Sequence, residues 1–159
     1  MTISKGRYIV LTGFSGTGKS VIGSKLSDLM GWEFIDTDSE IVRTSGKDVT
    51  TIFSEDGEAV FRDLEKQILS EAFNGTNRVI ATGGGAMADP DNRSRVLAEG
   101  LVVCLEASPD TICQRLDAQH NSRSPEIRPL LSGSEALEQI SSLKANRQSS
   151  YAIAHWTIQ

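Results

Sequence analysis

The sequence predicts an α/β fold: a three-layer αβα arrangement in which a five-stranded parallel sheet lies between two layers of helices. The first observation is a regular alternation of short apolar runs with amphipathic helical segments along the 159 residues, the pattern typical of parallel sheets covered on both faces. The second is a glycine-rich loop, residues 13–20, between the first apolar run and the first helical segment. Together they favour one domain over residues 1–159, long enough for a full hydrophobic core.

Each expected strand is a short apolar, β-branched run, and each expected helix has apolar residues at helical spacing. Glycine marks a helix end at Gly31, while Pro109 and the Asp89-Pro90 turn mark helix starts. The expected strands are 8–12, 33–36, 78–81, 101–105 and 155–159. The expected helices are 19–30, 39–44, 49–54, 57–73, 91–99, 109–116 and 134–152.

Composition argues against several classes of protein. The net charge of −5 disfavours a general nucleic-acid binder, although it allows local cationic pockets. No apolar run approaches the length of a membrane span and no signal peptide is present, so we expect a cytoplasmic protein with no membrane partner. Cys104 and Cys113 suit a reducing compartment, and neither they nor the two histidines have metal-ligand spacing.

The loop at residues 13–20 gives the most specific chemical signal. It reads Gly-Phe-Ser-Gly-Thr-Gly-Lys-Ser, the G-x-x-x-x-G-K-S pattern of a phosphate-binding P-loop. Glycines let the backbone N–H groups turn inward around a phosphate, and the N-terminus of the next helix adds partial positive charge. Lys19 is placed to reach the β- and γ-phosphates and Ser20 to ligate Mg²⁺. The strand before and the helix after disfavour an ordinary Gly/Ser turn.

Polar or small residues follow the second and third expected strands, where ligands of open α/β sheets bind. Of Asp36 and Asp38, one carboxylate could hold Mg²⁺ through water and the other a substrate hydroxyl, but Asp38 would equally suit a helix N-cap. The glycines at 83–85 would let a ligand approach the backbone closely. Because the third strand ends without an acidic residue, Asp36 would take the place of the usual metal-holding aspartate.

Two arginines, Arg62 and Arg128, have two interpretations each. Arg62 could be a surface charge paired with Glu58, or a fixed guanidinium that binds a carboxylate. Arg128 lies in a polar segment, 117–131, which we expect to form a mobile lid. An arginine on a closing lid could stabilise charge on a transferring phosphoryl group, or be a plain loop charge. Arg147, considered alone, would face solvent.

Taken in order, these elements resemble a shikimate kinase over nearly the whole chain. The resemblance rests on the P-loop, Asp36-Thr37-Asp38, Phe61-Arg62 with Glu65, Gly83–Gly85, Arg128-Pro129-Leu130-Leu131, and Arg147 with Tyr151. It implies a P-loop kinase of the nucleoside-monophosphate-kinase-like type. It also implies that the γ-phosphoryl group of Mg·ATP is transferred to the 3-hydroxyl of shikimate, giving shikimate 3-phosphate and ADP for chorismate and aromatic amino-acid biosynthesis.

The resemblance implies a role for each matching residue. The metal would be held by Ser20 and by Asp36 through water, and the expected catalytic residues are Lys19, Asp38 and Arg128. Helices within 37–73 would carry much of the substrate site. ATP would be contacted by Gly13, Ser15, Gly16, Thr17, Gly18, Lys19, Ser20, Val21, Arg115 and Arg128. Shikimate would be contacted by Asp38 at its hydroxyl, by Arg62 and Arg147 at its carboxylate, and by Gly84 and Gly85 at its ring.

Two features depart from the family pattern. The segment from Arg115 to Arg128 is longer than the usual lid, which leaves Arg123 as a possible stand-in for Arg115. The chain also stops at its last expected strand without a terminal helix, so we expect either that the fold tolerates the loss or that the sequence is a piece of a longer protein. A gluconate kinase-like enzyme, a catalytically silent domain and a nucleic-acid-binding P-loop protein are the alternatives. The combination of Asp38, Arg62 and Arg147 favours shikimate, and we expect a monomer.

Overall fold

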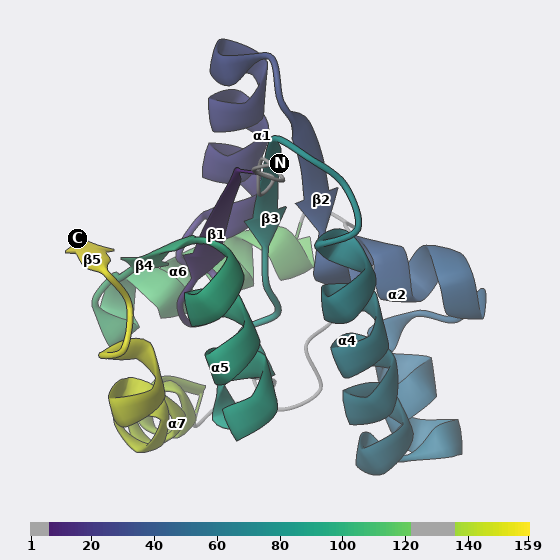
Figure 1. Ribbon diagram of the computed structural model, residues 1–159. Helices are drawn as coiled ribbons and strands as arrows, with labels where there is room; N and C mark the ends of the chain where they lie inside the picture. Colours follow the sequence, from purple (N-terminus) through teal and green to yellow (C-terminus); the bar gives the residue numbers. More distant parts are fainter. Residues whose placement is uncertain (1–6, 122–135) are drawn as a thin grey trace, which may run out of the picture.

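Five strands form one parallel sheet in the part of the chain that the computed structural model describes, residues 7–121 and 136–159. Each of the four strand pairings is parallel. The last strand is one residue shorter at each end than the sequence predicts, and the other four agree with the prediction. The strands are β1 (Tyr8–Thr12), β2 (Glu33–Asp36), β3 (Arg78–Ala81), β4 (Leu101–Leu105) and β5 (Trp156–Ile158), in the order β2-β3-β1-β4-β5 (Figure 1).

Helices make up most of the remaining described structure. The predicted helix at 49–54 is one α-helical turn followed by a π-helical turn, and residues 134–135 of the predicted last helix lie outside the described residues. The helices are α1 (Lys19–Met30), α2 (Thr37–Ser45), α3 (Val49–Thr51), α4 (Glu58–Ala72), α5 (Pro90–Glu99), α6 (Pro109–Asn121) and α7 (Ala136–Tyr151), with the π-helical η1 (Ile52–Asp56) and the 3₁₀-helical η2 (Ala86–Ala88).

The sheet has a hydrophobic core on each face, because alternate residues of a strand point to opposite sides. On one face, Val10 and Ile80 belong to a core shared with α4, α5 and α7. On the other face, Leu11 and Val79 pack in a second core with Leu26 of α1. Helices therefore cover both sides of the sheet, which confirms the predicted αβα layers (Figure 1). None of the helices within residues 7–121 and 136–159 combines the length and the apolar character that crossing a membrane requires.

The start of α2 corrects one interpretation of the two aspartates. The N-cap of α2 is Asp36, whose Oδ1 accepts a hydrogen bond from the Ser39 N–H at 3.1 Å. The helix therefore begins at Thr37, two residues earlier than predicted, and Asp38 lies in its first turn. The N-cap interpretation of Asp38 is wrong because the strand ends directly in the cap residue with no intervening turn.

The end of α6 corrects the start of the predicted lid. Residues 117–121 form the last turn of α6 instead of loop. They contain no proline or glycine that would end a helix, and residues 117–119 are exposed, so no apolar period marks the turn in the sequence. The rest of the predicted lid, 122–131, lies outside the described residues, and with it Arg123 and Arg128.

Candidate active site

The P-loop connects β1 to α1 in the geometry that its sequence predicts. Gly13, Gly16 and Gly18 have positive φ angles of 131°, 79° and 96°. At Gly13 a Cβ atom would lie 2.2 Å from the carbonyl oxygen of Leu105 in β4, so only glycine fits this approach to the sheet. Gly18 is the N-cap of α1 and offers no capping side chain, which leaves the first N–H groups of the helix to an anion.

Lys19 lies inside the curve of this loop. Its ammonium group is buried and donates hydrogen bonds to the carbonyl oxygens of Gly13 and Phe14, each at 2.8 Å. Thr17 Oγ1 also donates to the Phe14 oxygen at 2.8 Å and tightens the turn. Both acceptors of the ammonium are neutral, and a phosphate oxygen would form a stronger, charge-assisted bond.

Ser20 and Asp36 meet where the predicted metal site should be. Ser20 Oγ, in the first turn of α1, donates a hydrogen bond to Asp36 Oδ2, while the other carboxylate oxygen caps α2. One hydroxyl and one carboxylate fit Mg²⁺, which prefers oxygen ligands and retains several waters. No group of three or more His, Cys, Asp or Glu side chains in the described ranges could hold a metal ion. Water and phosphate oxygens would therefore supply the other ligands.

Arg115 and Val21, two further residues that are predicted to contact the nucleotide, lie near the P-loop. Arg115 of α6 donates from Nη1 to the Gly16 carbonyl oxygen at 3.2 Å. It also lines an open hollow with Thr111 and Lys144, which leaves room for a base beside the P-loop. Val21 follows Ser20 in α1 and is exposed.

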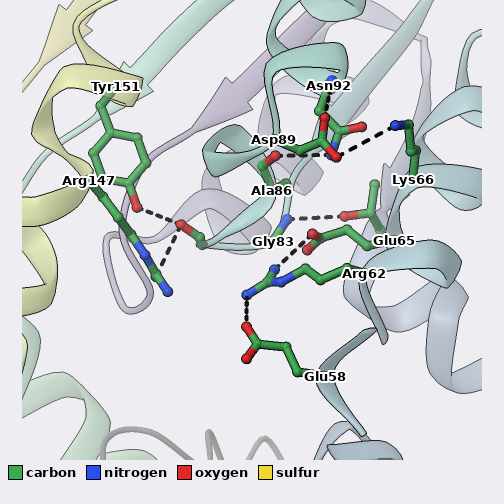
Figure 2. A network of polar contacts seen from close by, with 12 residues as sticks. Glu58, Arg62, Glu65, Lys66, Gly83, Ala86, Asp89, Asn92, Arg147 and Tyr151 are labelled. Atoms are coloured by element: carbon green, nitrogen blue, oxygen red, sulfur yellow. Dashed lines mark hydrogen bonds and ion pairs between the residues drawn. The ribbon is translucent and has the colours of Figure 1, made fainter. Parts of the chain in front are cut away.

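A second pocket, open to solvent on one side, lies against the P-loop. Figure 2 shows Arg62 and Arg147 extending toward the same space from α4 and α7. The structure thus brings the predicted acceptor residues together: Asp38, Arg62, Gly84, Gly85 and Arg147 all line this pocket. Sequence reasoning missed its apolar wall, formed by Val49, Phe53, Phe61 and Leu143.

The triple glycine lies close against side chains of the site itself. A Cβ at Gly83 would lie 2.7 Å from Asp38 Oδ1 and 2.8 Å from Glu65 Oε2. A Cβ at Gly84 would lie 2.7 Å from the Ser15 hydroxyl oxygen, and one at Gly85 2.8 Å from the Arg62 guanidinium. Each glycine therefore gives space to a polar side chain of the pocket, a reason that the sequence pattern alone did not supply.

Glu65 is a buried carboxylate beneath Arg62. Its side chain is 2% exposed and accepts a hydrogen bond from Arg62 Nη1 at 2.8 Å, while Arg62 Nη2 lies 3.5 Å from Glu58. Burial raises the pKa of Glu65 to about 7, Arg62 opposes this rise, and Asp38 adds to it. The i, i+3 spacing from Arg62 was the signal in the sequence, since residues at this spacing share a helix face.

We expect Glu65 to make the stability of the protein depend on pH. An ordinary glutamate pKa is about 4.3, so between there and pH 7 the folded protein keeps a proton that the unfolded chain has lost. The contribution is complete below pH 4.3 and is lost as pH rises through 7, by about 3 kcal/mol. Denaturant unfolding at pH 4.5 and 7.5 should show this loss in the wild type and not in Glu65→Gln. Parallel profiles for the two proteins would contradict it.

The family model described as shikimate kinase matches residues 15–158 of the chain. The chain belongs to the shikimate kinase family. The shikimate kinases of Pelotomaculum thermopropionicum and Symbiobacterium thermophilum are 38% and 40% identical to it over 148 and 146 residues, which cover 93% and 92% of this chain and 83% and 82% of theirs. The solved structure of the Acinetobacter baumannii shikimate kinase in complex with shikimate matches with a TM-score of 0.88 and 35% identity, covering 96% of this chain and 82% of that one.

These similarities confirm the predicted family, the P-loop kinase fold, and ATP-dependent shikimate kinase activity with Mg²⁺. They favour shikimate kinase over the gluconate kinase-like alternative. The roles of individual residues stay predictions.

Proposed function

We propose that this chain phosphorylates the 3-hydroxyl of shikimate with Mg·ATP at two adjoining sites that meet at the P-loop. The observation that carries the proposal is the second pocket, in which the carboxyl group of Asp38 and two guanidinium groups, with Glu65 behind Arg62, surround a space lined by Phe14 and Ser15 of the P-loop itself. The relative whose structure holds shikimate supports the same acceptor. A small carboxylic acid with hydroxyl groups matches this set of charges.

Arg62 and Arg147 bind the shikimate carboxylate in this proposal. Planar guanidinium groups bind carboxylates through paired hydrogen bonds, which fixes orientation as well as position. Both side chains are held before substrate arrives, Arg62 by Glu65 at 2.8 Å and Arg147 over the ring of Phe14, 5.6 Å from its centroid. Preorganised donors reduce the entropy that binding must offset.

Asp38 accepts a hydrogen bond from the reacting hydroxyl, orients it and takes its proton as the oxygen receives the phosphoryl group. Phosphoryl transfer depends mainly on position and electrostatics, so an oriented hydroxyl is most of what the acceptor side must provide. The backbone at Gly84 and Gly85 contacts the ring, and the apolar wall from Val49 to Leu143 packs on its carbon face.

Lys19 and the backbone N–H groups of the P-loop hold the phosphates of ATP, and Ser20 and Asp36 hold Mg²⁺. The metal ion, when bound, neutralises charge on the phosphate oxygens. Arg115 would contact the adenine. Arg128 would stabilise charge on the transferring group, a proposal that rests on the resemblance of Arg128-Pro129-Leu130-Leu131 to the family's lid.

We also infer a cytoplasmic monomer. Cys104 and Cys113 are free thiols, as suits a reducing compartment. Light scattering of the purified protein tests the monomer directly.

The experiment that tests the function measures ADP release from Mg·ATP with shikimate, with gluconate and with no acceptor in parallel. We expect release with shikimate alone, and ³¹P spectra that show a phosphate monoester on the acceptor. Release with gluconate alone would leave the ATP site standing and reject the acceptor site. Tight ATP binding without turnover on any acceptor would indicate a silent domain.

A further inference from the structure

Three buried side chains hold the glycine segment from outside the pocket. Thr37 Oγ1 of α2 accepts a hydrogen bond from the Gly83 N–H at 3.1 Å, and Asn92 Nδ2 of α5 donates to the Ala86 carbonyl at 3.0 Å. Tyr151, at the end of α7, donates its hydroxyl hydrogen to the Gly84 carbonyl at 2.5 Å. The segment is therefore a fixed wall of the pocket.

The Gly84 carbonyl has a second, weaker donor. Arg147 Nη1 lies 3.4 Å from the same oxygen, and Figure 2 shows both contacts converging on it. A distance of 3.4 Å is beyond the usual N–H···O range, whereas 2.5 Å is at the short end for O–H···O. Tyr151 therefore satisfies most of the hydrogen-bonding capacity of this oxygen. Arg147 and Tyr151 are one helical turn apart on α7, so they approach it from the same side.

Tyr151 is suited to this task throughout the working pH range. Its side chain is 3% exposed, and burial raises the pKa of the phenol to about 12, so the hydroxyl keeps its hydrogen and remains a donor. Arg147 is only half-buried and lines the pocket. The two donors therefore divide their tasks: the phenol donates to the backbone, and the guanidinium, which also lies against the phenol oxygen, faces the pocket.

We propose that Tyr151 is a positioning residue for the acceptor: by occupying the Gly84 carbonyl, it leaves the Arg147 guanidinium to the substrate carboxylate. The inference rests on the proposed role of Arg147. Without the hydroxyl, a buried carbonyl would lose its main donor, which is costly. Arg147, already 3.4 Å away, would move to satisfy it. Substrate would then compete with the backbone for the same guanidinium group.

Tyr151→Phe tests the proposal in the intact protein. We expect the shikimate Kd and KM to rise about tenfold, the effect of redirecting one charged donor, while the ATP Kd changes less than about twofold. The matched control is Tyr8→Phe, because Tyr8 is also buried and its hydroxyl donates to the Phe73 carbonyl at 2.7 Å, at the end of β1 away from the P-loop. Tyr8→Phe should lower the free energy of unfolding about as much as Tyr151→Phe does, and it should keep the wild-type shikimate KM. Equal shikimate affinity in the two variants would overturn the proposal.

A double-mutant cycle separates this inference from the proposed function. If Tyr151 acts through Arg147, Tyr151→Phe should weaken shikimate binding in the wild type and have less than about a twofold effect in an Arg147→Ala background. The same loss in both backgrounds would overturn the mechanism and leave Tyr151 with a structural role. An Arg147→Ala variant with unchanged shikimate Kd would instead reject the carboxylate site itself.

Discussion

Asp38→Asn is expected to lower kcat roughly 10²- to 10⁴-fold, the usual effect of removing a positioned proton acceptor, while ATP binding persists. Asparagine has the same shape, but it carries no charge and cannot accept the hydroxyl proton. Asp38 is fixed in the first turn of α2, and its Oδ1 faces Gly83 beside Glu65. A small change of chemistry at a fixed position should therefore affect turnover far more than folding.

The measurement is single-turnover phosphorylation of shikimate, with ATP affinity measured separately by titration. Asp48→Asn is the matched control, because Asp48 caps α3 by accepting from the Thr51 N–H at 2.7 Å and lies outside the pocket lining. Asparagine caps helices as well as aspartate does, so this variant should keep near-normal turnover. Near-normal turnover in Asp38→Asn would reject its proposed role.

The sequence predicted the strands well because a short apolar run marks each of them. Most residues of the runs 8–12 and 101–105 are buried, on both faces of the sheet, and both runs are therefore largely apolar. The N-cap of α2 was harder to predict. Asp36 and Asp38 are both good cap residues, and only the position at which β2 ends determines which of them caps the helix. The last turn of α6 was missed because its residues 117–119 are exposed, so no apolar period marks it in the sequence.

The site could be predicted only in part, because its residues are far apart in the sequence. Arg62 and Arg147 are separated by 85 positions in the sequence and lie on different helices. No local sequence pattern indicates that these two helices face the same pocket. Their pairing came from the family resemblance, and the structure brings them together. Glu65 received no role because its burial is not evident from its i, i+3 spacing to Arg62, and Tyr151 received none because its partner, the Gly84 carbonyl, is distant in sequence. Buried polar contacts between segments are therefore what sequence reasoning could not supply.

Arg62→Ala is expected to weaken shikimate binding by about 2–5 kcal/mol, as when one partner of a buried charge pair is removed. The same change leaves Glu65 buried without its cation, so the variant should also be less stable above pH 7, where Glu65 carries its charge. Loss of binding could then be confused with partial unfolding.

The double variant Arg62→Ala/Glu65→Gln resolves the two effects. Glutamine cannot ionise, so the double variant should recover most of the stability lost at pH 7.5 and none of the shikimate affinity. Arg43→Ala is the control for charge alone, since Arg43 is exposed on α2 and paired with Glu40 at 2.6 Å, and it should leave the shikimate Kd unchanged. Calorimetric titration of shikimate into the three variants gives each Kd directly. An unchanged Kd in Arg62→Ala would reject Arg62 as a carboxylate ligand, whereas a Kd weakened in Arg62→Ala and restored along with stability in the double variant would mean that Arg62 only holds Glu65 in place.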